Sequence, residues 1–424
     1  MRHAVAGGAV GELGILGVPA RLTNLTVMST AAPAGGFTPP IYPYARLDAL
    51  KQRAAEAPGG IVDLSIGTPH DPVPEIVVKA LAEAGPGSAG YPRAIGGPVL
   101  REAAAGWMER MFGVAVDPAH VVNCIGTKEL VASLPHLLRL RDPSRDTVLY
   151  PAISYPTYAM GAELGGCRAV PVPLDADWHL DLSAVSEEDV GRALLLWLNE
   201  PGNPTGSQSA PPPMAAAVEW AAARGVIVAS DECYVEFNWD AAGDRAPGAT
   251  ALSGGVDGVL AVHSLSKRSN MAGYRCGFLA GDGDLVAYIA SVRTHAGMMV
   301  PGPIQAAAAA AWADDEHVEV QRARYAERRR YAKSRLGEIG LRDAGGPSSF
   351  YLWARSADPA EDGWAVTARL AESGMLVAAG DLYGDGGAGH VRIALVEPLA
   401  RLELAFDRLA VATPHTLATG GSPP

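Results

Sequence analysis

The sequence predicts an α/β fold, with a large domain built on a mostly parallel central sheet and a smaller α+β domain. Three apolar runs, at residues 193–197, 226–229 and 258–265, have the composition of buried parallel strands. Helix-forming stretches separate the runs, and strands that alternate with helices indicate a parallel sheet with crossover connections. At 424 residues and 48% hydrophobic, the chain is long and apolar enough to bury a large core.

The elements follow one another in an order that predicts five segments. We expect an N-terminal extension without fixed structure at 1–40, an entry segment of the small domain at 41–74, a large domain at 75–300, a small C-terminal domain at 301–412 and a disordered tail at 413–424. Both ends are rich in Ala, Gly, Pro and Thr, which rarely form a packed core. The small domain should pair a helix near Val318 to Gly337 with short strands at 349–354 and 390–395.

Charge and composition exclude several classes of function. A formal net charge of -12 argues against a nucleic-acid surface. Five arginines lie between 322 and 330 and are interspersed with Ala326 and Glu327, after Glu319, so we interpret them as the solvated face of a helix. The four cysteines are scattered, which indicates no zinc site and no disulfide framework and suits a reducing cytoplasm. The uncharged stretch 294–313 contains two prolines, a glutamine and a histidine, so we expect a buried helix from Ile304 and no membrane span.

Polar residues follow each of the three strand-like runs. Asn203 lies in a Pro-Gly-Asn-Pro-Thr-Gly turn after the first run, Asp231 and Tyr234 follow the second, and Ser264 and Lys267 follow the third. Parallel strands end at one edge of a sheet, where α/β proteins bind ligands. The sequence therefore predicts a site with a lysine, a carboxylate, an amide and a phenol.

The lysine and two other segments point to specific chemistry. A nucleophilic lysine must lose its proton near neutral pH, which requires burial or a neighbouring cation, and Arg275 is a candidate for that cation. Gly126 precedes a helix-forming stretch, so backbone amides at its start could bind an anion. Arg392 interrupts an apolar strand pattern, and a charge in that position needs a partner or a function.

Together these segments resemble fold-type I pyridoxal-phosphate enzymes, specifically class I/II aminotransferases, from about Tyr42 to Leu409. The resemblance implies that Lys267 is the catalytic residue and binds pyridoxal 5'-phosphate covalently. It also implies that Asp231 pairs with the ring nitrogen, which keeps the ring able to accept electrons. Asn203 and Tyr234 would hydrogen-bond the phenolic oxygen of the ring.

The same resemblance assigns the remaining contacts. The phosphate would be bound by amides, a hydroxyl and a guanidinium from Thr127, Lys128, Ser264 and Arg275. Tyr155 would stack on the ring. Tyr91 would reach the phosphate of a neighbouring subunit, so we expect a homodimer. Arg392 and Gly67 would meet the substrate's alpha-carboxylate.

Segments at 66–74, 126–129, 230–234 and 294–301 look most like actinobacterial-type succinyldiaminopimelate aminotransferases. The expected reaction of lysine biosynthesis exchanges an amino group between N-succinyl-LL-2,6-diaminopimelate and 2-oxoglutarate, with ping-pong kinetics. The expected partners are thus small molecules, namely amino-acid and 2-oxo-acid substrates, and Arg293 is the candidate for the donor's distal carboxylates.

Two alternatives remain open at this point. Another aminotransferase or a carbon-sulfur lyase would carry the same cofactor motifs, because these motifs define the cofactor better than the substrate. A non-catalytic regulator that binds the cofactor would need a DNA-binding module, for which the N-terminal segment is too short and too poor in Lys and Arg.

Overall fold

The computed structural model describes residues 37–208, 210–240 and 242–412. The chain separates into two units, Met1–Tyr42 and Pro43–Pro424. In the first unit the described residues 37–42 have no regular secondary structure, and everything below concerns the second unit. Only 37–40 of the expected extension at 1–40 are described, and the expected tail at 413–424 lies outside the described residues.

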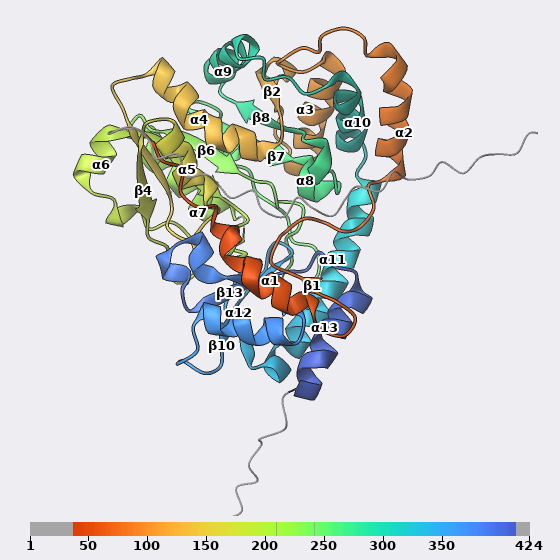
Figure 1. Ribbon diagram of the computed structural model, residues 1–424. Helices are drawn as coiled ribbons and strands as arrows, with labels where there is room; N and C mark the ends of the chain where they lie inside the picture. Colours follow the sequence, from red (N-terminus) through yellow and green to blue (C-terminus); the bar gives the residue numbers. More distant parts are fainter. Residues whose placement is uncertain (1–36, 209, 241, 413–424) are drawn as a thin grey trace, which may run out of the picture. The chain divides into compact units, whose positions relative to one another are not determined.

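The central sheet has seven strands in the order β2-β8-β7-β6-β5-β3-β4 (Figure 1). Their bounds are β2 Val121–Cys124, β3 Thr147–Pro151, β4 Arg168–Val172, β5 Ala193–Asn199, β6 Ile227–Asp231, β7 Val259–Ser264 and β8 Gly277–Gly281. The pairs β4 with β3, β3 with β5, β5 with β6 and β6 with β7 are parallel. Only β8 runs antiparallel to its neighbours, β7 and β2. The predicted mostly parallel sheet is therefore confirmed.

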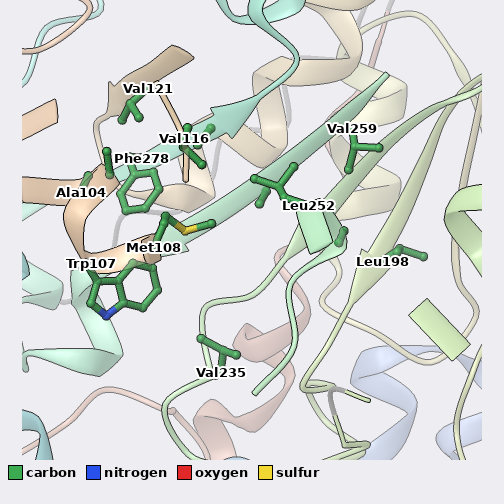
Figure 2. Close-up of a cluster of buried hydrophobic side chains, with 14 of the residues drawn as sticks. Ala104, Trp107, Met108, Val116, Val121, Leu198, Val235, Leu252, Val259 and Phe278 are labelled. Carbon is green, nitrogen blue, oxygen red and sulfur yellow. The ribbon is translucent and has the colours of Figure 1, made fainter. Parts of the chain in front are cut away.

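Apolar helices cover both faces of this sheet. On β5, Leu195 and Trp197 pack in one hydrophobic cluster with residues of α4, α5 and α9, whereas Leu196 and Leu198 pack in another with residues of α3, α7 and α10. Figure 2 shows part of the second cluster around Trp107 and Phe278. The bounds are α3 Pro98–Phe112, α4 Thr127–Arg141, α5 Thr157–Leu164, α7 Pro211–Ala222, α9 Gly283–His295 and α10 Gly302–Ala313. Burial on both faces explains why the strand sequences are continuously apolar.

A second, antiparallel sheet has four strands in the order β12-β13-β10-β9. Its bounds are β9 Leu341–Asp343, β10 Tyr351–Ser356, β12 Ala378–Ala379 and β13 His390–Ala394. A further parallel pair joins β1 Val62–Asp63 to β11 Met375–Leu376. Leu352 and Ile393 of this sheet share a core with residues of α11 Glu316–Arg335, α12 Gly363–Glu372 and α13 Leu399–Ala412. The boundaries expected between the domains stay predictions.

The other described helices are α1 Asp48–Ala55, α2 Glu75–Ala84, α6 Glu187–Arg192 and α8 Leu265–Arg268. The helix expected from Ile304 begins two residues earlier, at Gly302, with a proline in its first turn where no amide partner is needed. Across residues 37–412, apart from the undescribed 209 and 241, we find no helix with the length and apolar character that a membrane crossing requires.

One interpretation of the sequence was wrong in part. We expected the arginines of 322–330 to form a solvated helix face, and Arg324 and Arg330 are exposed, but Arg322, Arg328 and Arg329 are buried. They share a face of α11 with buried Tyr325, and each guanidinium is satisfied by a partner distant in sequence. Arg329, for example, donates to the backbone oxygen of Tyr351 at 2.9 Å. Arginine can be buried in this way because its planar group forms several hydrogen bonds at once.

Candidate active site

The carboxyl ends of β5, β6 and β7 lie next to one another, as the sequence predicts. Asn199 at the end of β5 pairs in register with Asp231 at the end of β6, and its Nδ2 donates to the backbone oxygen of Asp231 at 3.3 Å. The Oδ1 of Asn199 accepts a hydrogen bond from the backbone N of Asn203 at 2.9 Å, which fixes the turn that carries Asn203. Asn199 escaped the sequence analysis, although its place as the last residue of an apolar strand was a usable signal.

Lys267 lies on α8, directly after β7. The Ser264 hydroxyl begins this helix by accepting a hydrogen bond from the backbone N of Ser266 at 3.1 Å. The Nζ of Lys267 donates to the backbone oxygen of Gly67. Burial, with smaller contributions from the charges of Arg392 and Arg275 and against an opposing one from Cys233, lowers the pKa of Lys267 to about 8. The predicted cation Arg275 thus contributes, but burial and Arg392 contribute more.

Three segments meet around the start of β8 and form a candidate anion cradle. Gly277, the first residue of β8, lies between Cys124 of β2 and Ser264 of β7. Gly126 and Thr127 lie two and three residues after Cys124, where α4 begins. The first backbone amides of α4 therefore lie near Arg275. Gly126 has a φ of 71°, and a Cβ there would be 2.7 Å from Nη1 of Arg275. Glycine is therefore required for the guanidinium to approach this helix start.

Arg275 keeps part of its hydrogen-bonding capacity for a ligand. Its Nη1 donates to the backbone oxygen of Ala272 at 2.9 Å, and its Nη2 makes a longer bond of 3.3 Å to the backbone oxygen of Ile125. No carboxylate of the described residues forms an ion pair with this guanidinium within 4.0 Å. Lys128 follows Thr127 on the first turn of α4 and is exposed. Together these groups are suited to a phosphate.

Asp231 is a buried carboxylate without a cation. Its oxygens accept hydrogen bonds from the hydroxyl of Tyr158 at 2.8 Å and from the backbone N of Cys233 at 3.3 Å. Burial raises its pKa above the ordinary value, and the bonds from Cys233 and Tyr158 oppose that rise. No basic side chain in the described part of the chain forms an ion pair with it. A protonated ring nitrogen would supply the missing positive charge.

Tyr158 connects this carboxylate to the predicted Tyr155, and the predicted Tyr234 packs against Tyr351. Tyr155 is half-buried, and its ring contacts the ring of Tyr158 edge to face at a centroid distance of 6.0 Å. Tyr158 itself was not predicted, although a second tyrosine three residues after Tyr155 could have indicated it. Tyr234 is buried, and its hydroxyl lies 3.0 Å from that of Tyr351.

Arg392, on β13, is also buried. Its Nη1 donates to Oδ1 of Asn203 at 2.9 Å and its Nη2 to the backbone oxygen of Ser65 at 2.7 Å. The rings of Tyr351 and Tyr383 lie 4.1 and 4.9 Å from the guanidinium carbon. No carboxylate of the described residues forms an ion pair with it, so a buried positive charge lacks its counter-charge.

Gly67 lies against the same tyrosine. A Cβ at Gly67 would be 2.7 Å from Cζ of Tyr351, so no larger residue fits without moving a buried ring. The structure thus brings Gly67, Asn203, Lys267 and Arg392 together through direct hydrogen bonds or contacts.

Two predicted residues lie elsewhere. Arg293 is completely buried, and its guanidinium donates to both carboxylate oxygens of Glu129 at 2.6 and 3.0 Å. Glu129 in turn accepts from the backbone N of Ile125 at 3.1 Å, next to Gly126. This pairing corrects our assignment of Arg293 to the substrate's distal carboxylates, because its donors already stabilise the start of α4. Tyr91 is 99% exposed, and its expected contact with a second subunit stays a prediction.

Comparison with known proteins identifies the family. The family described as "Aminotransferase class I and II" matches residues 60–409. The chain is 42% identical to 4-dedimethylamino-4-oxo-anhydrotetracycline transaminase OxyQ of Streptomyces rimosus, over 87% of this chain and 99% of that protein. It is 34% identical to LL-diaminopimelate aminotransferase of Aquifex aeolicus, over 87% of this chain and 96% of that protein. Its fold is similar to a solved structure described as a probable N-succinyldiaminopimelate aminotransferase from Thermus thermophilus, with a TM-score of 0.77, 33% identity and coverage of 88% and 100% of the two chains.

The chain therefore belongs to the class I and II aminotransferases, which depend on pyridoxal phosphate. The residues present fit this cofactor. A buried amine of lowered pKa, a buried carboxylate without a cation and a helix start beside a guanidinium correspond to its aldehyde, ring nitrogen and phosphate. The particular roles of Lys267, Asp231 and Arg275 follow as proposals.

Proposed function

We propose that this aminotransferase exchanges the amino group of N-succinyl-LL-2,6-diaminopimelate with 2-oxoglutarate. The observation that carries the proposal is Arg392, a buried guanidinium without a carboxylate partner among the described residues, one hydrogen bond from Asn203. An amino acid's alpha-carboxylate would supply the counter-charge through a two-pronged pair. The similarity to the solved structure from Thermus thermophilus favours the succinylated donor, and the relative from Aquifex aeolicus favours diaminopimelate chemistry more generally.

The family resemblance supplies the proposed roles, and the geometry of the chain supports them. When bound, pyridoxal phosphate supplies an aldehyde that carries the amino group and a ring that accepts electrons from the alpha carbon. Lys267 would hold the cofactor through its aldehyde, and its amine, when free, would take the proton from the alpha carbon of the substrate; a pKa of about 8 leaves a useful fraction of this amine neutral. Asp231 holds the ring nitrogen in its protonated form. Asn203 and Tyr234 donate to the phenolic oxygen, and Tyr155 stacks on the ring.

The phosphate would be held by the amides of Thr127 and Lys128, the hydroxyl of Ser264 and the guanidinium of Arg275. We further propose a homodimer in which Tyr91 reaches the phosphate of the other subunit. The nearly complete exposure of Tyr91 leaves its hydroxyl available for such a contact. Sedimentation of the loaded enzyme together with cofactor affinity of Tyr91→Ala would test this, and a fully active monomer would contradict it.

The decisive test of the substrate is a comparison of amino acceptors. With glutamate as donor, we expect the 6-oxo acid of the succinylated substrate to be aminated with a higher kcat/KM than the unsuccinylated analogue or common 2-oxo acids. Lys267→Ala is the control and should abolish turnover. A higher kcat/KM for another acceptor would replace the substrate but keep the reaction. Release of ammonia from a thioether donor without any 2-oxo acid would instead indicate a carbon-sulfur lyase.

A further inference from the structure

The segment 65–72 is attached to the rest of the protein at both ends and in the middle. At Ser65 the backbone oxygen accepts a hydrogen bond from Arg392, and at Gly67 from Lys267. These two donors are the groups proposed to bind substrate and cofactor. The segment therefore depends, in its first half, on side chains that must change partners during the reaction.

The second half is attached through Asp71. Its carboxylate accepts two hydrogen bonds from Arg328, both of 2.7 Å, and a third from Nε2 of Gln321 at 2.8 Å. The Asp71 side chain is 9% exposed. Burial alone would raise its pKa, but the hydrogen bonds of Arg328 and Gln321 and the charges of Arg328 and Arg324 outweigh burial and keep it below the ordinary value. The carboxylate is thus charged at neutral pH and accepts all three hydrogen bonds.

Arg328 and Gln321, the partners of Asp71, both lie on α11. This helix is hydrogen-bonded to the residues that follow Lys267. Gln321 Oε1 accepts from Nδ2 of Asn270 at 3.0 Å, and the same amide donates to the backbone oxygen of Pro72 at 3.2 Å. Asn270 lies three residues after Lys267. The end of the segment 65–72, helix α11 and the residues after Lys267 are therefore joined at Asn270.

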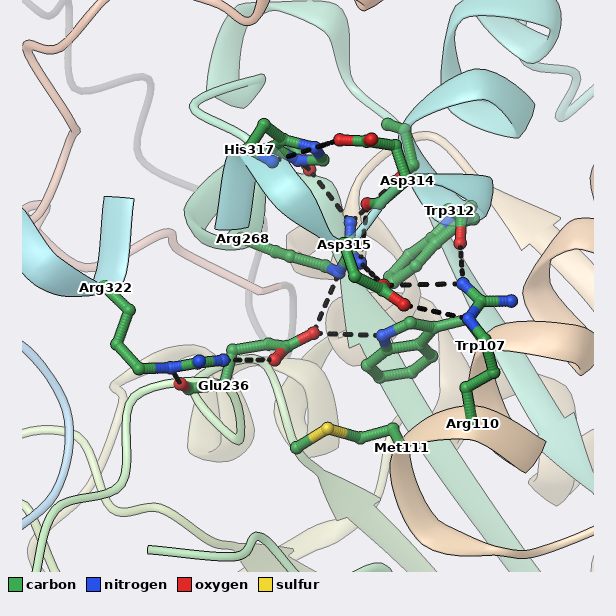
Figure 3. Close-up of polar contacts among 12 residues, drawn as sticks. Trp107, Arg110, Met111, Glu236, Arg268, Trp312, Asp314, Asp315, His317 and Arg322 are labelled. Atoms are coloured by element: carbon green, nitrogen blue, oxygen red, sulfur yellow. Dashed lines mark hydrogen bonds and ion pairs between the residues drawn. The ribbon is translucent and has the colours of Figure 1, made fainter. Parts of the chain in front are cut away.

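A buried carboxylate strengthens this connection (Figure 3). Glu236 accepts from Nη2 of Arg322 on α11 at 2.9 Å and from Nε of Arg268 at 3.0 Å. Arg268 is the residue after Lys267, and Trp107 of the central domain core adds a third hydrogen bond to Glu236 at 2.9 Å. The helix that holds Asp71 is therefore fixed relative to Lys267 by charged, buried bonds, which are the stronger class.

Cofactor and substrate binding would act on the attachments of the first half. Covalent attachment to the cofactor would remove the free ammonium of Lys267 that donates to Gly67, and a carboxylate bound by Arg392 would compete with the backbone oxygen of Ser65 for this guanidinium. Asp71, Arg328 and Gln321 have no part in either exchange. Their bonds remain when the others are released.

We propose that Asp71, held by Arg328 and Gln321, is a positioning residue that keeps Gly67 over the substrate's alpha-carboxylate once Lys267 and Arg392 have exchanged their partners. The proposal rests on the proposed function in one respect, namely that Gly67 faces that carboxylate. Asp71 itself contacts neither substrate nor cofactor.

The test compares Asp71→Asn with Asp407→Asn in the cofactor-loaded full chain. Asp407 is a matched control, because it also pairs with an arginine of α11, Arg335 at 3.1 Å, but its side chain is 67% exposed. In Asp71→Asn we expect peptides covering 64–72 to exchange amide hydrogen roughly tenfold faster, the loss typical of one hydrogen bond to a charged group. The KM for the amino donor should rise roughly tenfold while kcat changes less than about twofold. Asp407→Asn should change neither.

Several outcomes would overturn the proposal. The positioning role would be refuted if amide-hydrogen exchange in 64–72 is unchanged in Asp71→Asn. It would also be refuted if kcat falls in this variant with no rise in KM. Should Asp71→Asn fail to fold, Arg328→Lys keeps the charge but loses the two-pronged bond, and it should give a smaller change of the same kind; no change in exchange would again refute the role. The exchange measurement needs no turnover, so it remains decisive even where Lys267 or the proposed substrate is wrongly assigned.

Discussion

Gly126→Ala tests the anion cradle most sharply, because the structure gives both the strain and the neighbour it would displace. Gly126 has a φ of 71° and a ψ of 150°, a backbone conformation found essentially only in glycine, so an alanine there is strained by about 1 to 3 kcal/mol. The added Cβ would also lie 2.5 Å from Cζ and 2.7 Å from Nη1 of Arg275, so the guanidinium must move away. Loss of a charged, two-pronged phosphate contact is worth ~1.5 to 3 kcal/mol. We therefore expect the dissociation constant of pyridoxal phosphate to rise ~10- to 100-fold.

Gly113→Ala separates the two effects. Gly113 follows α3 with a φ of 68°, but a Cβ there would meet nothing within 4 Å. Gly113 is in the left-handed helical conformation, so Gly113→Ala should lose about 1 to 2 kcal/mol of unfolding free energy and keep its cofactor affinity. The assay is urea unfolding of the cofactor-free protein, together with titration of pyridoxal phosphate followed by absorbance. The cradle would be refuted if the cofactor affinity of Gly126→Ala stays within about twofold of the original value. An equal loss of cofactor affinity in Gly126→Ala and Gly113→Ala would also refute it.

Three further outcomes are expected. Because the pKa of Lys267 is lowered from 10.5 to about 8 in the folded protein, the cofactor-free protein binds fewer protons than its unfolded chain between these pH values. Its stability in urea unfolding, relative to that of Lys267→Met, should therefore rise by up to about 3 kcal/mol from pH 8 to 10.5. A stability difference that does not change with pH would contradict the lowered pKa. Arg392→Lys should raise the KM for amino donors at least ~10-fold with unchanged cofactor uptake, because lysine cannot form the two-pronged pair; an unchanged KM would remove Arg392 from the substrate site. Arg293→Met should cost about 3 to 5 kcal/mol of stability, because Glu129 is left unpaired, and should leave the ratio of kcat/KM for succinylated and unsuccinylated substrates unchanged; a selective loss on the succinylated substrate would restore the original assignment.

The sequence predicted the part of the site that follows strand order. Asn203, Asp231 and Lys267 each follow a continuously apolar run, and adjacent parallel strands necessarily bring such residues to one edge. Gly126 and Arg275 were recognisable because a glycine before a helix and a basic residue near the lysine have a direct chemical reason. The fold class was predictable for the same reason, since burial on two faces leaves a strong apolar signal.

What the sequence could not predict depends on partners far apart in the chain. Arg293 looked free because Glu129 lies 164 positions away, and only the fold brings the two together. Arg328 looked exposed because its partner Asp71 is 257 positions away. A charged residue in a helix is usually solvated, so no local pattern distinguishes it from one that is buried with a distant acid. Tyr351, which closes over Gly67 and Arg392, was missed because an aromatic residue on a strand is most often simply core.

The covalent bond at Lys267 is the central claim, and borohydride reduction tests it most directly. The protein is incubated with pyridoxal 5'-phosphate, reduced, digested and analysed by mass spectrometry beside Lys267→Ala. We predict one reduced adduct, on the peptide that contains Lys267, and none in the variant. An adduct on a different lysine, or no adduct with excess cofactor, would contradict the assignment.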